Sequence, residues 1–506
     1  MGWAEPALGQ IRGAYLPLDH PAHPVAELLV ARGTLQGLDG AQRPFSLAAL
    51  RRSVARAVDA AGADGPSPSL VWLAGTVLTP LPDDAWGASL ELDVGLLAYT
   101  DPSRELLLAE DGGDEVADLQ AIRFGAEFGP VSMQIEPRRI MGGKDVEYPV
   151  GLGRAEWRWG WVQWGQVVRS WGPPGVSGLP ISPLAPGRSE FAFALGPEAL
   201  RFEYRAAVLS DGVSRETGDP VARHWASHRL RWRPAGSFEM SIWETTLSAE
   251  EGGPDAARFS PFIPFALFAQ EDRDDERNVV IGLDASWRVS PGFLLETQFA
   301  LDDFISEDDN PYPHRYGFTV QARGPAGRGG AWRGYLTALS GWALNTFDPA
   351  EAYLDDENGL GRLRPDHWEA GAFWSFGSGF SSTPDDSPGS SAGGGSPGAT
   401  KVGWPGQGVL SAGLRWRRQG VREFTDPFPD LEPGDERLPA FSAEIEREVW
   451  ALVAQGDWIA GPLVLQGEAQ LQRLRFPVSG AGSEWGVEAR VQLVWRIGPW
   501  SWQRPS

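Results

Sequence analysis

Aromatic and acidic side chains occur together in the polar stretches near residues 302–315 and 347–369. An aromatic ring offers a flat apolar face to the C–H groups of a sugar, and a neighbouring carboxylate accepts hydrogen bonds from its hydroxyls. This pairing predicts glycan binding, and the same residues would also suit the rim and interfacial aromatic belt of a membrane protein. The glycan-binding candidates are Tyr312, Tyr316, Trp368, Asp308, Asp309 and Asp366.

Long acidic stretches separate the apolar parts of the chain at 109–118, 248–278, 302–315 and 347–369. Carboxylate oxygens are the ligands that Ca²⁺ takes, so a calcium site is one interpretation. The spacing matches no EF-hand loop, and runs of like charge are commonly solvated. We therefore predict no cofactor and assign no metal ligands, with a divalent cation such as Ca²⁺ as the alternative.

Residues suited to catalysis are few. The chain has no cysteine, which removes thiolate catalysis and thiolate metal sites together. His224 and His228 would share one face of an extended segment, but four residues at about 3.3 Å each place them about 13 Å apart, too far to hold one metal ion. A Ser/His/Asp set could be assembled around His314, yet these residue types occur by chance in any chain this long. We predict no catalytic residue and no enzymatic activity.

The overall charge excludes another class of partner. Acidic side chains outnumber basic ones by 67 to 44, which gives a formal net charge of -23. Nucleic-acid binding requires clustered Lys and Arg to neutralise phosphates, so a nucleic-acid partner is not expected. No uninterrupted apolar run reaches about 20 residues, and a transmembrane helix is therefore not expected either.

The segments between the acidic stretches alternate apolar and polar residues one by one. In "SEWGVEARVQLVWRI", residues 483–497, Trp485, Val487, Val491 and Trp495 fall on one side of an extended chain, opposite the polar side that carries Glu488. This period of two indicates β-strands. The same pattern occurs at 200–208, 279–289, 293–301 and 463–471, and more loosely at 88–99, 118–128, 131–140, 154–165, 190–196, 221–233, 237–247, 315–323, 331–343, 367–376, 409–419 and 449–459.

These segments predict about 16–18 antiparallel strands, each long enough to cross a bilayer when tilted. A soluble sandwich would have shorter strands, and a propeller would repeat at about 40 to 50 residues, a period that is missing here. Tryptophans near strand ends are typical of the two aromatic girdles of a membrane barrel. Trp157, Trp159 and Trp161 would share one face of the 154–165 segment. We predict a mainly β protein, a transmembrane antiparallel β-barrel closed so that no strand edge meets lipid.

The polar faces of such strands would line the barrel interior. Inward charges of both signs could set a transverse field in an aqueous channel, or they could pair across the lumen and fill it. The long stretch 248–278, with the apolar "FIPFALF" inside it, could fold over the mouth. The residues predicted to face the lumen are Arg201, Glu203, Arg205, Asp284, Arg288, Glu296, Glu488 and Arg490.

In the first part of the chain, apolar residues recur with the spacing of helices and not with the alternation of strands. Residues 24–33, 45–62 and 70–81 carry helical spacing, with Ser46 as a candidate N-cap and Gly62 as a candidate left-handed C-terminal residue. We predict a leader remnant or linker over 1–13, a small periplasmic helical bundle over 14–85 and a barrel over 86–502. The long acidic loops would be extracellular, and the Gly/Ser/Pro-rich stretch 376–408 is predicted to be a disordered loop.

Three pieces of the chain, in this order, resemble a known family. They are "RPFSLAALRRSVARAV", "WGQVVRSWGPPGVSGLPISPLAPGRSEFAFAL" and "PFALFAQEDRDDERNVVIGLDASW". The middle piece is the most specific, and the chain is similar to the capsule-assembly outer-membrane barrels called Wzi. The resemblance implies a barrel of about 18 strands with a periplasmic helical bundle, acting as a lectin that holds polysaccharide at the cell surface. The residues that match the family motif are Arg169, Trp171, Gly172, Pro173 and Ser182.

Together these observations predict a monomeric outer-membrane protein of a Gram-negative-type bacterium. It would bind capsular or exopolysaccharide and help to attach or assemble it at the surface, with outer-membrane lipids around the barrel. The alternative is a porin-like channel for small hydrophilic solutes.

Overall fold

The structure is a computed structural model of the whole chain. It describes residues 11–62, 65–77, 86–100, 116–141, 146–183, 187–213, 218–250, 260–262, 264, 278–303, 311–327, 329–346, 349–355, 358–362, 364–378, 407–424, 426, 431, 435–480 and 482–504.

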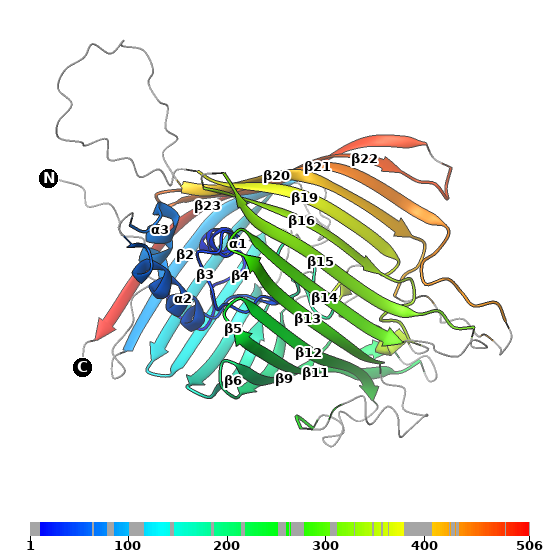
Figure 1. The fold of residues 1–506 in the computed structure, drawn as a ribbon, viewed down its shortest axis with the longest axis horizontal. Coiled ribbons are helices and arrows are strands. Elements are labelled where there is room, and N and C mark those ends of the chain that lie inside the picture. Colours follow the sequence, from blue (N-terminus) through cyan, green and yellow to red (C-terminus); the bar gives the residue numbers. More distant parts are fainter. Residues whose placement is uncertain are drawn as a thin grey trace, which may run out of the picture.

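Eighteen of the described strands form one closed antiparallel barrel, which confirms the predicted fold class (Figure 1). Each strand pairs with the next along the chain, and the pairing of the first with the last closes the barrel. The barrel strands are β2 (Trp86–Tyr99), β3 (Val116–Phe128), β4 (Val131–Met141), β5 (Val146–Trp157), β6 (Gly160–Val167), β8 (Arg188–Leu195), β9 (Leu200–Val208), β11 (Pro220–Ala235), β12 (Phe238–Glu250), β13 (Asn278–Ser290), β14 (Phe293–Asp303), β15 (Arg315–Ala326), β16 (Gly330–Leu339), β19 (His367–Ser378), β20 (Gln407–Gly420), β21 (Ile445–Ala460), β22 (Leu463–Arg475) and β23 (Ser483–Arg504).

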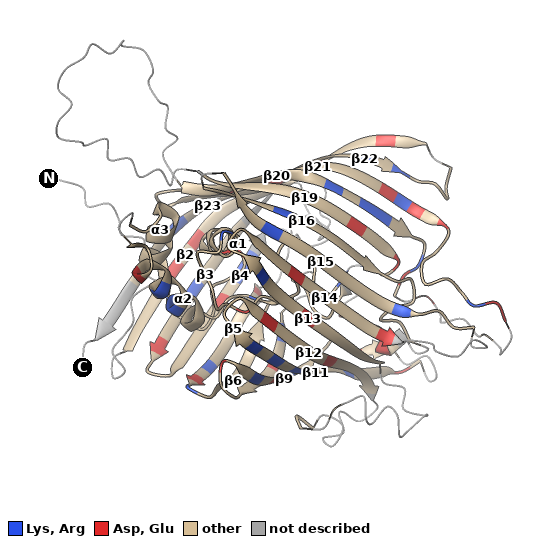
Figure 2. Cartoon of the chain, in the orientation of Figure 1, with Lys and Arg blue, Asp and Glu red and all other residues tan. Residues whose placement is uncertain are grey.

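Along these strands, apolar side chains face outward and polar side chains face the barrel interior. In β23, Trp485, Val487 and Trp495 are exposed on the outside, with 69%, 63% and 55% of their surface free. On the opposite face, Glu488 accepts hydrogen bonds from glutamines of β22, and Arg496 pairs with Asp93 of β2 inside the barrel. Figure 2 shows that Arg and acidic residues lie on strands all around the barrel, separated by uncharged positions. The pattern follows from an apolar outer surface and a polar interior.

One predicted strand was wrong. The segment 154–165 is a hairpin in which β5 ends at Trp157 and β6 begins at Gly160. Glu156 pairs directly with Trp161, and directly paired residues share a face of the sheet. Even-numbered positions therefore face inward before the two-residue turn, and odd-numbered positions face inward after it. Trp161 is therefore buried inside the barrel, 4% exposed, whereas Trp157 is exposed on the outside.

The connections differ at the two ends of the barrel. At one end the turns are short: 129–130, 158–159, 196–199, 236–237, 291–292, 327–329 and 461–462. Gly129 and Gly461 have φ of 55° and 60°, a left-handed conformation that glycine adopts at little cost. The other end carries the long connections, which include 168–187, 209–219, 340–366 and 421–444.

The Gly/Ser/Pro-rich stretch does not join the long-loop end, although it was predicted to be one of the long loops. β19 reaches the short-turn end at Ser378, where Gly377 N–H donates to the carbonyl of Gly329 at 3.3 Å, and β20 starts from the same end at Gln407. Residues 376–378 and 407–408 are paired strand residues. The predicted disorder of 379–406 concerns residues outside those that the structure describes.

Three helices occupy the barrel mouth at the short-turn end: α1 (Ala22–Ala31), α2 (Leu47–Asp59) and α3 (Pro68–Val77) (Figure 1). Their apolar residues form one cluster with Ala331 of β16 and Val409 of β20. Ser46 stands at the N-terminus of α2, but its side chain makes no capping hydrogen bond. Within the described residues, no helix is both long enough and apolar enough to cross a bilayer. We call residues 11–77 the N-terminal plug.

The connection 168–182 folds into the barrel instead of leaving it. Its short strand β7 (Ser170–Trp171) pairs with β1 (Gln42–Arg43) of the plug, and Gly172 N–H donates to the carbonyl of Ala41 at 2.7 Å. Part of the 340–366 connection contains η2 (Pro349–Glu351), β17 (Leu354–Asp355) and β18 (Asn358–Gly359). Its Tyr353 and Leu360 pack in one apolar cluster with Trp171 of the folded-in connection. A further short strand, β10 (Gly212–Val213), extends β11. One sector of the lumen is thereby filled.

Candidate functional site

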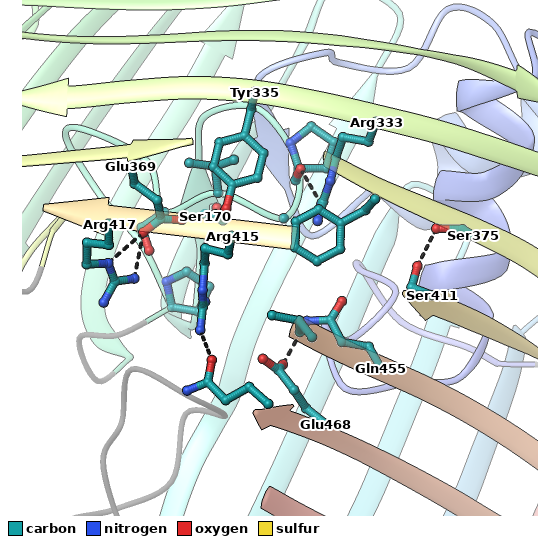
Figure 3. A pocket seen from close by; sticks show the side chains of 18 of the residues that line it. Ser170, Arg333, Tyr335, Glu369, Ser375, Ser411, Arg415, Arg417, Gln455 and Glu468 are labelled. Atoms are coloured by element: carbon teal, nitrogen blue, oxygen red, sulfur yellow. Dashed lines mark hydrogen bonds and ion pairs between the residues drawn. The ribbon is translucent and has the colours of Figure 1, made fainter. Parts of the chain in front are cut away.

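The unfilled sector of the lumen holds a cavity of about 1060 Å³. Inward-facing residues of β16, β19, β20, β21 and β22 form its outer wall, and α1 together with residues 174–177 forms its inner wall. The lining extends from Ala331 and Val409, near the short-turn end, to Arg364 and Glu446, near the long-loop end. It is therefore an elongated space that follows the strands. Figure 3 shows the polar side chains that project into it.

Arginines of β16, β20 and the 340–366 connection give the cavity a basic side. Arg333 donates to the carbonyl of Pro174 at 3.0 Å, and Arg415 donates to the amide oxygen of Gln470. Arg362 donates to the hydroxyls of Thr319 and Thr337 at 3.0 and 2.7 Å. Burial lowers the pKa of Arg362 to about 10, so its guanidinium stays charged at neutral pH.

Carboxylates and amides of β21, β22 and β23 form the facing side. Gln455 donates to Glu468 at 2.7 Å, and Gln466 donates to Asp457 at 2.7 Å. Glu488 accepts from both Gln470 and Gln472. These groups offer hydrogen-bond acceptors and donors in a row along the wall.

An aromatic and acidic group lies among the arginines on β16, β19 and β20. Tyr335 O–H donates to Glu369 at 2.6 Å, and Arg417 binds the other oxygen of that carboxylate at 2.6 Å (Figure 3). The rings of Tyr335 and Phe373 are stacked, with centroids 6.2 Å apart. A planar aromatic surface beside acceptors is an arrangement suited to hydroxyl-rich ligands.

The filled sector is organised around one buried carboxylate. Asp284 accepts from the indole N–H of Trp171 at 2.8 Å, from that of Trp243 at 3.0 Å and from the amide of Gln298 at 3.0 Å. Gln298 also accepts from Leu179 N–H at 2.8 Å, which fixes the folded-in connection to β14. Two of these hydrogen bonds, from Trp171 and from Leu179, join the folded-in segment to the strand wall, and the other two connect β12 and β14 to β13.

The family-motif residues all belong to this internal structure. Arg169 binds Glu190 of β8 with its Nε 3.0 Å from the carboxylate, and Ser182 N–H donates to the carbonyl of Leu360 at 2.7 Å. At Gly172, a Cβ atom would lie 2.8 Å from Gly178 and 2.9 Å from the Gln298 side chain. Trp171, Gly172 and Pro173 continue directly from β7. These positions shape the fold of the segment inside the lumen.

Charge pairs hold the plug to the barrel wall. Asp39 binds Arg229 at 2.7 Å and Arg231 at 3.0 Å, both on β11. Glu27 of α1 binds Arg323 of β15 at 2.8 Å and also Arg43. Burial alone would raise the pKa of Glu27, but the two guanidinium groups outweigh it and hold the pKa below its usual range.

Acidification is expected to weaken plug docking. Burial of His23, whose ring stacks on Phe45 at 5.3 Å, lowers its pKa from 6.5 to about 4, and burial also lowers the pKa of His20. The unfolded histidine binds a proton near pH 6.5 and the folded one does not, so the contribution is complete above pH 6.5 and falls as the pH drops toward 4. The loss for His23 approaches about 3 kcal/mol. Protease protection of the plug between pH 7.5 and pH 4 measures it, and His23→Gln should reduce the pH dependence; an unchanged dependence would contradict the assignment.

The glycan-binding candidates do not converge on the cavity. Tyr316 and Trp368 occupy outward-facing positions of β15 and β19 and pack on Phe441, with ring centroids 6.0 and 5.0 Å away. Asp366, at φ 55°, accepts from the backbone N–H of Ser442 at 3.0 Å and serves the local turn. Tyr312 O–H contacts the carbonyl of Leu431 at 3.5 Å. Asp308 and Asp309 lie outside the described residues, and a glycan role for this set stays a prediction.

The residues predicted to face the lumen lie on the inner surface. Asp284 and Glu296 are buried there, and Glu296 binds Arg323 at 2.7 Å. Arg288 donates to the carbonyl of Val30 in α1 at 2.7 Å. The others make contacts within the barrel or line its cavities: Arg201, Glu203, Arg205, Glu488 and Arg490. Of the eight, only Glu488 lines the large cavity.

The cavity residues themselves were missed as a set. The alternation of 463–471 places Gln466, Glu468 and Gln470 on one face, which is a visible signal for part of the wall. Nothing in the local sequence indicates that Arg333, on another strand, lies across from them. Its position depends on barrel closure and on the sector that the plug leaves open.

No group of three or more His, Asp or Glu side chains suited to a metal ion occurs among the described residues. The acidic stretch 109–118 has only its last residues, 116–118, within the described part, and 248–278 is described only at 248–250, 260–262, 264 and 278. Calcium binding by the acidic loops therefore stays a prediction.

Comparison with known proteins identifies the fold. No protein-family model and no curated protein sequence matches this chain. Among solved structures, it is similar to Wzi of Escherichia coli, an outer membrane protein involved in group 1 capsule assembly and a carbohydrate-binding β-barrel. The two share 14% identity with a TM-score of 0.62, over 96% of this chain and 99% of that chain. The chain has the fold of an outer-membrane β-barrel.

Two proteins of Pseudomonas aeruginosa are less similar. OccK3 shares 11% identity with a TM-score of 0.45, over 82% of this chain and 96% of that chain. The outer membrane protein OprD shares 10% identity with a TM-score of 0.44, over 84% and 95% of the two chains.

Proposed function

We propose that this protein is a non-enzymatic member of the Wzi-like group that binds surface polysaccharide at the outer membrane and helps to attach it to the cell. The observation that carries the proposal is the elongated polar cavity beside a filled sector. A space of about 1060 Å³ is large for a small-molecule pocket, which typically encloses about 300–1,000 Å³. It could accommodate a segment of a glycan chain.

The lining supports a sugar ligand. Gln455, Gln470 and Gln472 supply amide groups, Glu468 supplies a carboxylate, and Tyr335 supplies an aromatic face within the same cavity. Sugars present hydroxyls that both donate and accept hydrogen bonds, so a mixed row of amides and carboxylates suits them better than a surface of one charge sign. Wzi of Escherichia coli, which shares the fold, is a carbohydrate-binding barrel and supports the same proposal.

We infer the orientation from the connections. Short turns are periplasmic in outer-membrane barrels and long loops are extracellular, which places the plug on the periplasmic side. The exposed apolar belt, which includes Trp164, Leu452 and Trp485, would contact outer-membrane lipids. A closed barrel has no free strand edge, and we propose that it acts as a monomer.

A channel for small hydrophilic solutes is the second candidate. It is favoured by the extent of the cavity lining, which reaches from Val409 near the short-turn end to Arg447 near the long-loop end. Guanidinium groups on one side and carboxylates on the other would give a solute path a transverse field.

A matched pair of variants tests the use of the cavity. Val453 of β21 lines it, and its neighbour Leu452 points outward with 58% of its surface exposed. Val453→Trp fills the cavity, whereas Leu452→Trp adds the same side chain on the lipid side. We expect Val453→Trp to reduce binding of the cell's own surface polysaccharide by about tenfold or more and Leu452→Trp to leave it unchanged. The measurement is polysaccharide retention on cells that express each variant, with outer-membrane levels matched.

Planar-bilayer recording separates the two candidates. A polysaccharide-binding barrel with a filled sector should give no stable large conductance steps after confirmed insertion. Stable steps that Val453→Trp reduces and Leu452→Trp does not, together with unchanged polysaccharide retention, would replace the proposed function with the channel.

A further inference from the structure

The outer face of β20–β23 is layered at the long-loop end. Directly paired residues of neighbouring strands lie side by side on one face of a sheet, so each level of the wall can be followed across the four strands. The level nearest the end is charged, the next is aromatic with one arginine, and the third is aliphatic. In this order the levels are Arg418, Glu448, Arg475 and Ser483; Trp416, Trp450, Arg473 and Trp485; and Leu414, Leu452, Leu471 and Val487.

This face points away from the cavity. Trp450, Leu452 and Trp485 have 55%, 58% and 69% of their surface exposed. Their sequence neighbours Val449 and Val453 pack in a cluster inside the barrel. Aromatic residues beside an aliphatic band mark the boundary between the hydrocarbon and the headgroups of a membrane. The charged level therefore lies at the depth of the lipid headgroups.

Positive charge exceeds negative charge on this face. Arg475 binds Glu448 at 3.3 Å, and the same carboxylate accepts from the indole N–H of Trp416 at 3.1 Å. Arg473 donates to a serine hydroxyl of β23 at 3.3 Å. Among the described residues, no carboxylate forms an ion pair with Arg418 or Arg473. Three guanidinium groups and one carboxylate leave an excess of two positive charges on the two outer levels.

The other described carboxylates near this end of β21 and β23 lie on the cavity side of the wall. Glu446 binds Arg364 at 3.3 Å and lines the cavity. Glu484 stands opposite Leu474, which packs against the cluster inside the barrel. The excess of positive charge on the outer face therefore remains.

Arginines at this depth suit a phosphorylated lipid. A long basic side chain beside an apolar surface keeps its charged end among the headgroups, and guanidinium groups bind phosphates through paired charge-assisted hydrogen bonds. Clusters of basic residues at a membrane surface recognise anionic headgroups. Arg418 and Arg475 lie two strands apart, about 10 Å at about 4.8 Å between neighbouring strands. This spread suits a headgroup with two separated phosphates better than one with a single phosphate.

We propose that Arg418, Arg473 and Arg475 bind the phosphate groups of a diphosphorylated acyl-sugar lipid, of the lipid A kind, in the outer leaflet. The phosphates of this lipid contact the three guanidinium groups, and its acyl chains lie along the aliphatic level of β20–β23. The site is on the outside of the barrel and is independent of polysaccharide binding in the cavity. The inference uses only the proposed orientation, in which the long-loop end is extracellular.

Native mass spectrometry of the full chain in detergent tests the site with three lipids. Diphosphoryl and monophosphoryl lipid A share their sugars and acyl chains and differ by one phosphate, whereas phosphatidylglycerol carries one phosphate on a glycerol. We expect diphosphoryl lipid A to bind at least about tenfold more tightly than either of the others. The double variant Arg473→Gln and Arg475→Gln should reduce binding of diphosphoryl lipid A by about tenfold and leave phosphatidylglycerol binding unchanged.

Arg139→Gln is the matched control, because Arg139 is an exposed arginine near the long-loop end of β4 whose directly paired residues, Gln120 and Val146, are uncharged. Heat-modifiable migration reports correct folding of each variant. Equal binding of the three lipids, or equal losses in the control and the double variant, would overturn the site. A preference for phosphatidylglycerol that the double variant abolishes would assign the arginines to a phospholipid and overturn the assignment to lipid A. Retention of polysaccharide in the cavity-filling experiment is unaffected by any of these results, so the two inferences can fail separately.

Discussion

Asp39→Asn is expected to release the N-terminal plug from the barrel wall, with a loss of about 3–5 kcal/mol in its docking. The substitution keeps the shape of the side chain and removes its charge. Arg229 and Arg231 would then lie in the interior without the carboxylate that they share at 2.7 and 3.0 Å. Burial alone would raise the pKa of Asp39, but these guanidinium groups hold it well below its usual range.

Limited trypsin digestion measures the release, since α2 carries Arg51, Arg52 and Arg56 and a docked helix is protected. The control is Asp59→Asn at the exposed end of the same helix, where the same chemical change removes no ion pair among the described residues. If both variants resist trypsin equally, Asp39 does not hold the plug.

Trp171→Ala is expected to cost about 3–5 kcal/mol, because truncation of a buried tryptophan leaves a cavity that its neighbours fill only in part. Trp171 is 3% exposed, and its ring lies 5.4 Å from that of Trp243. The change also removes the indole N–H that Asp284 accepts at 2.8 Å. The folded-in connection 168–182 would lose one attachment to the wall, while those of Arg169 and Leu179 stay.

Two measurements follow for Trp171→Ala. The thermal unfolding midpoint should fall, and a reconstituted barrel should show new, fluctuating conductance as the filled sector loosens. Trp164→Ala is the matched control, because Trp164 lies on the outer face of the preceding strand, β6, with 75% of its surface exposed. A Trp171 variant that stays as heat-resistant and as electrically silent as the Trp164 variant would show that the other contacts of the connection, such as Arg169 with Glu190, are enough to hold it.

Local pattern alone predicted the barrel because the physical rule is local. A strand with lipid on one side and a polar interior on the other must alternate apolar and polar side chains, as residues 485–497 do. This pattern can be recognised without knowing which strands pair with it. Helical spacing near 45–62 likewise predicted α2, although the helix ends at Asp59. The alternation rule failed where it was applied across a turn. In the 154–165 segment, the two-residue turn switches the inward-facing positions from even to odd numbers, so Trp161 faces inward.

The site could not be predicted in the same way. Arg333, Arg362 and Arg415 come from two strands and one connection, and only closure of the barrel and the path of the 340–366 connection bring them to one cavity. Those aromatic and acidic candidates that the structure describes lie on the outer face or in the connections, because proximity along the chain does not fix which side of a strand faces a ligand. The tertiary structure also decided which inward charges pair.

The residues alone predict a transmembrane β-barrel with an apolar outside, a charged inside and a helical N-terminal segment. That this segment fills one sector of the lumen, that residues 168–182 join it there, and that a polar cavity remains beside β16 and β19–β22 became visible only in the folded chain. The two kinds of feature depend on interactions of different range along the chain. Alternation reflects the two solvents that meet each strand, whereas the cavity depends on contacts such as Asp39 with Arg229, which lie far apart in the sequence.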